Sequence, residues 1–395
     1  MRSAILAAQT RRSPVSDVLT FFDDAQIRNP YPRYGQWRAR HPAWFDEASN
    51  RWIVSRHADV FDILKDHQRF SSAAMGAALP LPTLTDDPPR HTQMRSIVNK
   101  AFTTAMLKRV EPDVAVIAND LVGALAVGCD VDVVEGLTIP LPVTVISRMM
   151  GIPEERQADF KRWSDALTGT LSGATDERRK SEFMEMATFF RELIAQRRAT
   201  PSNDLVSAVA NAEVDGVQLS DWEAVGFNVL LLIAGNETTT NLLGNMLNVF
   251  AERPDLWRRL RDEPELIEAA IEETLRYDSP VQFVMRRAKE DVTLHGARIS
   301  AGQDVIVVMG SANRDGDVFE SPDDYLIERP RNRHLSFGYG IHFCIGAPLA
   351  RLEARIAMRA LVARAQTLER GAGHTRRVGS HLLRGFDALS VRLTV

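Results

Sequence analysis

The segment from Phe337 to Gly346 constrains this chain most, because it sets a cysteine among glycines just ahead of a helical pattern. Cys344 is one of only two cysteines in 395 residues. Glycines at this density let the backbone take positive φ and approach a flat ligand closely. A thiolate ahead of a helix N-terminus is stabilised by the helix dipole and by free N–H groups. A cysteine that only packs in a core would leave the glycines and His342 unexplained, so the pattern favours a metal-bound thiolate.

Composition indicates a soluble globular protein. Apolar residues make up 45% of the chain and charged residues 25%, as in proteins with a sizeable core. A net charge of −4 argues against nucleic acid as an overall partner. Cys129 and Cys344 are too few for a disulfide framework, which favours the reducing cytoplasm. The apolar runs near the N-terminus and at residues 229–234 are too short to span a membrane, so we expect no membrane attachment.

Helical periodicity dominates from about residue 91 to 275, whereas strand patterns lie toward the two ends of the chain. Trp44–Asp46 and Trp52–Val54 flank a turn and predict a hairpin. Further strands are expected at residues 292–294, 304–309 and 389–395. Many helices with small sheets predict a mainly α protein of the α+β class. Residues 1–20 are expected to form a loosely held tail.

A long helix is predicted to start at Ser220, where a capping-box pattern stands, and to run toward Pro254. Roughly thirty residues span about 45 Å, enough to cross the protein. Both flanks are mostly apolar, yet the centre holds six consecutive polar residues, from Asn236 to Asn241. Such residues are costly inside a buried helix unless they have partners or a task. A helix break at Gly235 is the alternative.

The segment around Cys344 resembles the cysteine-ligand loop of the cytochromes P-450, the haem-thiolate monooxygenases. The matching positions are Phe337, Gly338, Gly340, His342, Cys344 and Gly346. The resemblance implies a single P-450 domain over residues 21–395, helix-rich with small β-sheets. It implies haem b buried between the long distal helix and the cysteine loop, with Cys344 as the axial iron ligand.

The resemblance also gives the centre of the long helix a role. The position of Gly235 implies a groove in which a diatomic ligand lies beside the haem. Glu237 and Thr238 resemble the acid–alcohol pair that delivers protons during oxygen activation. The family often carries Asp where Glu237 stands, a difference that alters reach rather than chemistry.

Glu273 and Arg276 stand three residues apart on one helix face. Taken alone, such a pair is worth little if it is exposed. In the family this position carries a Glu-x-x-Arg core helix, so the resemblance implies a buried structural pair. A third partner is expected from the loop ahead of the cysteine, either Arg331 or Arg333.

Haem propionates need cations or strong donors. His91 and Arg95 share a helix face, and the Asp-Pro-Pro before them resembles the entry to the family's propionate-binding helix; taken alone they could be a solvated face. Arg286 matches the family's propionate arginine, while the adjacent Arg287 would face the other side of a strand. The resemblance also places His342 at the haem edge.

A hydrophobic substrate is favoured, because the residues at the family's substrate-contact positions are mostly apolar, with Gln282 the polar candidate. Each of these residues could equally be an ordinary core residue that does not contact a substrate. The candidates for the pocket wall are Met75, Leu79, Leu81, Ala234, Val281, Phe283 and Val284.

Taken together, the sequence predicts an enzyme, an O2-dependent monooxygenase that hydroxylates, epoxidises or dealkylates a hydrophobic small molecule. As the resemblance implies, NAD(P)H-derived electrons would arrive through a ferredoxin or flavodoxin and its reductase. We expect a monomer. One alternative is a peroxygenase or another P-450-fold enzyme that needs no reductase, and another is a non-catalytic haem sensor or carrier.

A basic row after the cysteine loop suggests where that electron donor docks. Arg351, Arg355 and Arg359 recur every four residues, and the family places the cations of residues 100–109 (Lys100, Lys108 and Arg109) on the same face. The residues alone allow a merely solvated face, whereas the resemblance favours a docking site for an acidic ferredoxin.

Overall fold

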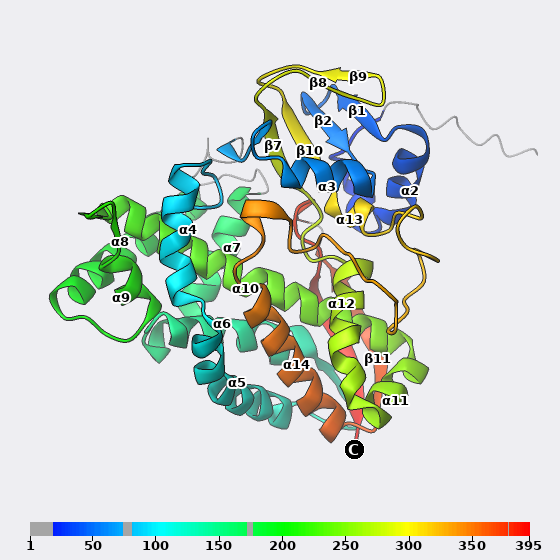
Figure 1. Ribbon diagram of the computed structural model, residues 1–395. Coiled ribbons are helices and arrows are strands. Elements are labelled where there is room, and N and C mark those ends of the chain that lie inside the picture. Colours follow the sequence, from blue (N-terminus) through cyan, green and yellow to red (C-terminus); the bar gives the residue numbers. More distant parts are fainter. Residues whose placement is uncertain (1–18, 74–80, 172–176, 378) are drawn as a thin grey trace, which may run out of the picture.

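The computed structural model describes residues 19–73, 81–171, 177–377 and 379–395. Its helices are α1 (Asp24–Ile27), α2 (Tyr31–Arg40), α3 (His57–Lys65), α4 (Arg90–Ala101), α5 (Thr104–Ala124), α6 (Pro140–Met149), α7 (Gln157–Leu171), α8 (Glu177–Ala199), α9 (Leu205–Ala210), α10 (Asp221–Glu252), α11 (Pro254–Asp262), α12 (Ile267–Tyr277), α13 (Met309–Ala312) and α14 (Ala347–Arg364). Its strands are β1 (Ala43–Asp46), β2 (Arg51–Val54), β3 (Phe70–Ser71), β4 (Asp130–Asp132), β5 (Glu213–Val214), β6 (Val217–Gln218), β7 (Val284–Ala288), β8 (Val292–Leu294), β9 (Ala297–Ile299), β10 (Asp304–Val307), β11 (Thr367–Arg376) and β12 (Phe386–Thr394). The helix-rich fold with small sheets is the predicted one (Figure 1).

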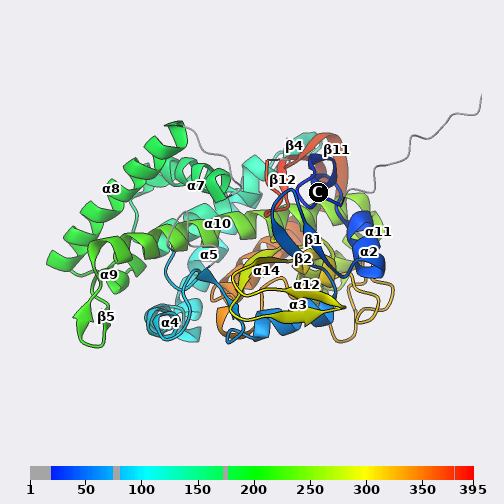
Figure 2. The same cartoon turned by 90° about the horizontal axis from the view of Figure 1, so that it is seen from above.

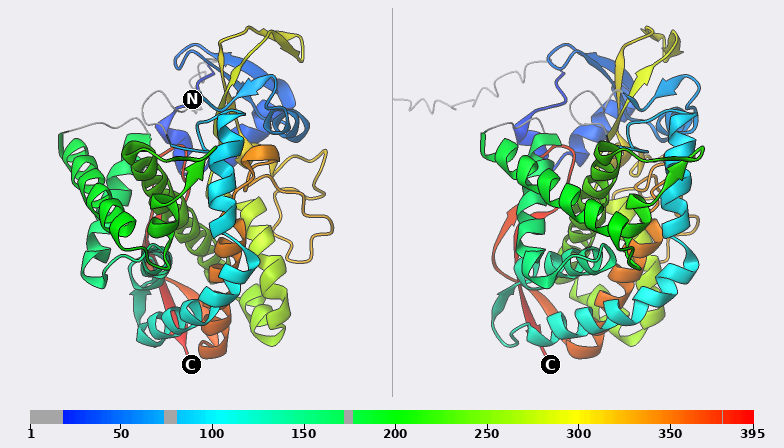
Figure 3. Two further views of the ribbon diagram at one scale, coloured as in Figure 1. Left: turned by 60° about the vertical axis from the view of Figure 1, so that its left-hand side comes forward. Right: turned by 90° about the vertical axis from the view of Figure 1, so that its left-hand side faces the viewer.

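One sheet joins strands from distant parts of the chain in the order β1-β2-β10-β7-β3. The predicted hairpin is present as β1 and β2, with Asn50 at its turn in a left-handed conformation of φ 53°. Strand β10 pairs in parallel with β2 and antiparallel with β7. Both views of Figure 3 show this sheet at one end of the molecule, with the helices below it. Pairing with β10 on one side and β3 on the other therefore fixes the position of β7 within the sheet.

Helix α10 runs through the middle of the molecule (Figure 2). The predicted capping box is formed: the Glu223 N–H donates to Ser220 Oγ at 3.3 Å and the Ser220 N–H donates to the Glu223 carboxylate at 2.9 Å. The helix ends ahead of Pro254, as the backbone of that residue requires. It is continuous through Gly235, so the alternative of a break is wrong. Its flanks pack into two large apolar clusters, which hold both halves in one line.

The C-terminal hairpin of β11 and β12 packs along α10 and is tied down by Asp278. This fully buried carboxylate accepts from Tyr31 Oη at 2.8 Å, from Arg376 at 2.8 Å and from Arg384. Burial would raise the pKa of Asp278, but the arginines hold it well below its usual range. Asp278 thus joins the N-terminal segment, the end of α12 and the C-terminal hairpin.

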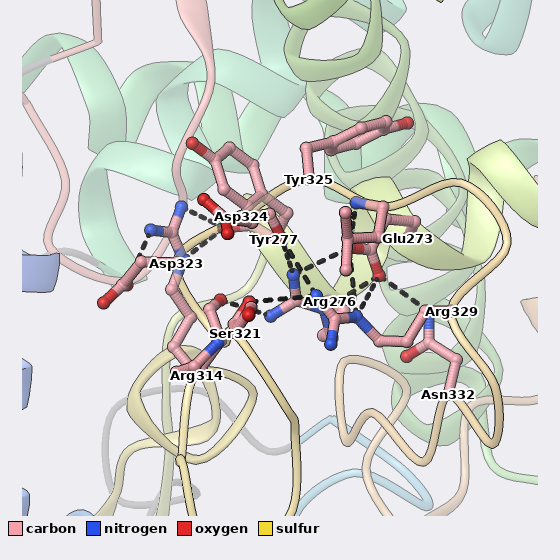
Figure 4. A network of polar contacts seen from close by, with 12 residues as sticks. Glu273, Arg276, Tyr277, Arg314, Ser321, Asp323, Asp324, Tyr325, Arg329 and Asn332 are labelled. Atoms are coloured by element: carbon pink, nitrogen blue, oxygen red, sulfur yellow. Dashed lines mark hydrogen bonds and ion pairs between the residues drawn. The ribbon is translucent and has the colours of Figure 1, made fainter.

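Glu273 and Arg276 form a fully buried pair on α12 (Figure 4), with N–O distances of 2.7 and 2.8 Å. The third partner is Arg329, whose Nε lies 3.1 Å from both Glu273 oxygens. The expectation of Arg331 or Arg333 is wrong. Arg331 adopts a left-handed φ of 56° and is exposed, and Arg333 is exposed too, so neither side chain reaches the core.

The network yields a stability prediction. Arg329→Met should lower the free energy of unfolding by about 3–5 kcal/mol, because it leaves the buried Glu273 short of one cation. The matched control is Arg331→Met, which should change it by less than about 0.5 kcal/mol. Urea unfolding followed by circular dichroism measures both. Equal effects of the two substitutions would contradict the assignment of Arg329.

Candidate active site

The cysteine loop is shaped by two glycines in the left-handed region. Gly338 and Gly340 have φ of 69° and 71°. A Cβ on Gly340 would also lie 3.0 Å from the Leu64 carbonyl oxygen. A side chain there would therefore strain the backbone of residue 340 and crowd the backbone of Leu64. The Cys344 N–H donates to the Phe337 carbonyl at 2.9 Å and closes the loop. These contacts fix the direction of the cysteine side chain.

The Cys344 thiol borders a cavity and stands immediately before α14. Burial raises the pKa of this thiol, while the N–H of Gly346, the guanidinium of Arg95 and the N–H of Ala347 act to lower it. These groups would stabilise a thiolate once a metal replaced the proton. In the part of the chain that the structure describes, no cluster of His, Cys, Asp or Glu side chains could hold a metal ion by itself. The role of Cys344 as an iron ligand stays a prediction.

Strand β7 presents two adjacent arginines to opposite sides, as its alternation requires. Arg286 is 5% exposed, lines the cavity and donates only to the backbone oxygen of Met285 among the described residues. Burial lowers the pKa of Arg286 to about 10. Arg287 is exposed and pairs with Asp304 at 2.7 Å. Asp87 opposes the lowering of the Arg286 pKa, but Arg286 has no ion pair among the described residues, so this buried cation is a ready site for an anionic group.

His342 and Arg95 line the same wall, and His91 lies against His342. The rings of His91 and His342 lie 4.4 Å apart between centroids. His342 contacts Ser72 Oγ at 2.9 Å, whereas neither buried ring nitrogen of His91 has a partner among the described residues. Burial lowers the pKa of His91, and burial with Arg286 lowers that of His342 to about 3. Arg95 lines the cavity and donates to the Phe343 carbonyl.

Helix α10 supplies the opposite wall with Ala234, Gly235, Thr238 and Thr239. Thr238 Oγ1 donates to the Ala234 carbonyl at 2.9 Å, which satisfies the hydroxyl within the helix. Gly235 also packs against α6, because a Cβ there would lie 3.1 Å from Ile146 Cγ1. The polar centre of α10 thus places a hydroxyl group at the cavity.

Glu237 does not line the cavity. Its buried carboxylate pairs with Arg377 at 2.6 Å and with Lys161 at 3.5 Å. Burial would raise the pKa of Glu237, but the two cations outweigh it and the pKa is lowered. Adjacent residues on a helix point about 100° apart, so Glu237 and Thr238 face different neighbours. Sequence reasoning missed Arg377 and Lys161, which lie far away in the chain.

The apolar wall differs in part from expectation. Ala234, Val281 and Val284 line the cavity, whereas Met75 and Leu79 lie outside the described residues. Two candidates are corrected. Leu81 is buried in the core beside α10, and Phe283 packs edge-on against Phe21, 5.2 Å away, in a separate aromatic cluster. Gln282 turns away as well, donating to the Ser279 carbonyl at 2.7 Å.

Sequence reasoning missed other members of this wall, although spacing on α10 carried a signal. Residues three or four positions apart share a helix face with Ala234 and Thr238. The missed apolar residues of α10 are Phe227, Leu230, Leu231 and Leu242.

The basic row on α14 is partly neutralised. Arg351 pairs with Glu272 of α12 at 2.6 Å, and Arg355 pairs with Glu111 of α5 at 2.8 Å. The expectation that these arginines form a row of unpaired positive charge is therefore wrong for Arg351 and Arg355, because acidic residues of the neighbouring helices pair with them. Arg359 is exposed and has no ion pair within the described part of the chain. Exposed cations without acidic partners there also include Lys100 and Lys108.

The cavity fits haem. It combines a thiol at one wall, a hydroxyl-bearing helix opposite, and a buried arginine with no ion pair among the described residues; beside its His342 lies His91, whose ring nitrogens have no partner among those residues. An iron porphyrin would supply the iron for the sulfur and two propionates for the cations. Fold and site together define a haem-thiolate protein. None of the described helices is long and apolar enough to cross a membrane.

Comparison with known proteins agrees. A model of the family Cytochrome P450 matches residues 43–369. Putative cytochrome P450 YjiB of Bacillus subtilis is 39% identical over 343 residues, covering 85% of this chain and 87% of its own. Cytochrome P450 monooxygenase PikC of Streptomyces venezuelae is 37% identical over 401 residues, covering 97% and 95%. The crystal structure of CYP109E1 from Bacillus megaterium with testosterone matches with a TM-score of 0.84 and 40% identity, over 93% of this chain and 100% of that one.

The chain belongs to the cytochrome P450 family. It is accordingly an oxidoreductase of the monooxygenase type that binds haem b and uses O2 with electrons derived from NAD(P)H.

The tether of Glu237 yields a second stability prediction. Arg377→Met should lower the free energy of unfolding by about 3–5 kcal/mol, because it strips a buried carboxylate of its closer cation. Glu237→Gln in the same chain should restore part of this loss. Urea unfolding at neutral pH of both single variants and the double variant measures the coupling. If the losses of unfolding free energy in the two single variants simply add up in the double variant, Arg377 stabilises the fold independently of Glu237.

Proposed function

We propose that this P450 inserts one oxygen atom of O2 into a C–H bond of a hydrophobic small molecule, with Cys344 as the axial ligand. The observation that carries the proposal is the cavity itself, bounded by the Cys344 thiol on one side and by the hydroxyl and apolar side chains of α10 on the other. Haem, when bound, supplies the oxygen activation and the hydrogen abstraction. The residues of the chain orient the substrate, exclude water and manage protons.

Arg286, His91, Arg95 and His342 are proposed to hold the propionates. Arg286, Arg95 and His342 line the cavity, and His91 lies against His342. Arg286 and His91 are buried with polar atoms that lack side-chain partners among the described residues. Charge-assisted bonds from the arginines would fix the cofactor's orientation. The neutral histidines would donate through a ring N–H without adding positive charge.

Thr238 is proposed to relay protons, because its hydroxyl lies on the cavity wall. Gly235, one turn earlier, leaves the wall open beside it. A part for Glu237 in proton delivery requires its carboxylate to leave Arg377 and Lys161 first. In the described conformation Glu237 instead anchors α10 to α7 and to the end of β11.

The substrate is proposed to be a bulky apolar molecule such as a steroid. Aliphatic and aromatic side chains dominate the wall above Cys344, from Phe227 to Val284. The similar CYP109E1 structure contains testosterone. Such a compound should displace water from the iron and give a low- to high-spin shift in the absorption spectrum. A steroid, fatty-acid and macrolide panel screened this way tests the assignment.

The thiolate ligand gives the central test. The reduced protein with carbon monoxide should show the strongly red-shifted Soret band of a thiolate-bound haem. Cys344→His should abolish both this band and NAD(P)H-driven hydroxylation, whereas Cys129→Ser should leave them intact. Turnover with peroxide alone at the same rate would favour a peroxygenase. Survival of the band in Cys344→His would contradict the assignment of the ligand.

A matched pair on β7 tests the propionate site. Arg286→Met should speed haem loss about tenfold or more, because one charge-assisted bond is worth about 1.5–3 kcal/mol. Arg287→Met, one position along, should leave the rate near that of the wild type. Transfer of haem to an excess of apomyoglobin measures the rate. Faster loss from Arg287→Met than from Arg286→Met would reverse the assignment.

The electron donor is proposed to be a cytoplasmic ferredoxin, or a flavodoxin, that docks on the face formed by α5, α12 and α14. This face lies on the thiolate side, since α14 starts directly after the cysteine loop. Exposed Lys108 lines the groove between these helices with Leu107 and Leu352. Exposed Arg359 adds positive charge further along α14, which the exposed Glu268 of α12 offsets in part. An acidic partner would be steered to such a face.

Charge reversal tests the docking face. Lys108→Glu and Arg359→Glu should each slow reduction by an acidic ferredoxin, and raised salt should slow the wild type too. Both residues are preferred to Arg355, whose reversal would also set two acids face to face. Arg40→Glu, on α2 and away from α14 (Figure 1), serves as the control. Stopped-flow reduction rates indifferent to salt and to both reversals would place the docking site elsewhere.

A further inference from the structure

Glu353 is a buried carboxyl group on α14 that the site described so far does not use. The residue is 1% exposed, and its Oε2 has no hydrogen-bond partner among the described residues. Its neighbours Arg351 and Arg355 turn outward to Glu272 and Glu111. Glu353 therefore lies on the inner face of the helix, away from those cations.

The inner face of α14 closes one end of the cavity. Glu353 lines it together with Leu349 of the same helix and with Thr239 and Leu242 of α10. Helices α10 and α14 pack against each other here. Among the described residues that line the cavity, Glu353 is the sole acid. It shares the cavity with Thr238, the proposed relay hydroxyl.

The protonation state of Glu353 follows from this setting. Burial raises its pKa well above the usual range, and no cation pairs with the carboxyl group among the described residues. Burial therefore favours the neutral carboxylic acid, which has an O–H to donate. Glu237 is its opposite: two cations keep it ionised, and it does not line the cavity.

We propose that Glu353 is the acid that supplies protons to the cavity during oxygen activation, an inference that rests on the proposed monooxygenase function. Converting a C–H bond and O2 into an alcohol and water consumes two electrons and two protons. The electrons come from the redox partner. The O–H bond of Glu353 breaks, and its proton passes to a threonine hydroxyl of α10 or to water. The carboxylate then regains a proton from solvent, so Glu353 is neither oxidised nor reduced.

Infrared spectroscopy tests the proton itself, without turnover. The haem-loaded wild type should show the C=O stretch of a protonated carboxyl group, shifted in D2O. This band should be lost in Glu353→Gln and kept in Glu237→Gln. A wild-type spectrum without the band, or a band that disappears with Glu237→Gln instead, overturns the inference whatever the variants do in turnover.

Coupling of electrons to product tests the role. Glu353→Gln keeps the shape of the side chain but has no acidic proton, so product per NAD(P)H should fall by about 10²-fold, the lower end for a positioned general acid. The carbon monoxide band and the substrate-induced spin shift should stay. Glu353→Asp should restore much of the coupling, and Glu369→Gln, on the exposed side of β11, should match the wild type.

The outcomes separate this inference from the proposed function. A wild type that hydroxylates no compound of the panel contradicts the proposed function, whereas the infrared band still decides the state of Glu353. Unchanged coupling in Glu353→Gln, with the wild type active, overturns the role of Glu353 alone. Should Glu353→Gln fail to retain haem, Glu353→Asp and the wild-type band decide. Equal loss in Glu353→Asp and Glu353→Gln would mean a packing role and also overturn it.

Discussion

The structure depends on a buried helix of 32 residues, α10, which runs through the middle of the molecule and determines which partners its neighbours must supply. No water surrounds most of α10, so each polar side chain at its centre needs a partner or must face the cavity. Thr238 faces the cavity, Glu237 meets Arg377 and Lys161, and Asn245 donates to the backbone at Asp278 and Arg384. These three side chains thus face three neighbours: the cofactor cavity, α7 and the C-terminal hairpin. Asn241, in contrast, has no partner for either side-chain polar atom among the described residues.

The cavity concentrates groups that the protein alone leaves uncompensated. Arg286 is charged and buried there, and Glu353 keeps an oxygen without a partner among the described residues, as do both ring nitrogens of His91 next to the cavity. Each costs free energy in the absence of a ligand. The buried carboxylate of Glu273, by contrast, is paired with Arg276 and Arg329. A cofactor that pairs with the uncompensated groups would therefore stabilise the fold when it binds.

Local patterns made much of this structure predictable. The capping box at Ser220, the turn at Asn50 and the glycines before Cys344 act within a few residues. β-Strand alternation predicted that Arg286 and Arg287 face opposite sides, and the family resemblance was needed to choose Arg286 for the cavity side. Partners remote in the chain were not predictable. The choice of Arg329 over Arg331 depends on how a long loop folds, and the direction of Glu237 depends on Arg377 and Lys161. Phe283 belongs to an aromatic cluster whose other members lie near the N-terminus.

The tie at Asp278 bears on how the molecule is made. Tyr31 emerges from the ribosome well before its carboxylate partner Asp278, and the arginines that neutralise that carboxylate, Arg376 and Arg384, follow later still. Cys344 is also synthesised late, and strand β2 can pair with β10 only after β10 has been synthesised. The nascent chain therefore cannot close its cofactor cavity until Cys344 and the segments that tie down Asp278 have been synthesised. Until then the apolar walls made earlier, such as α10, stay exposed and prone to aggregation.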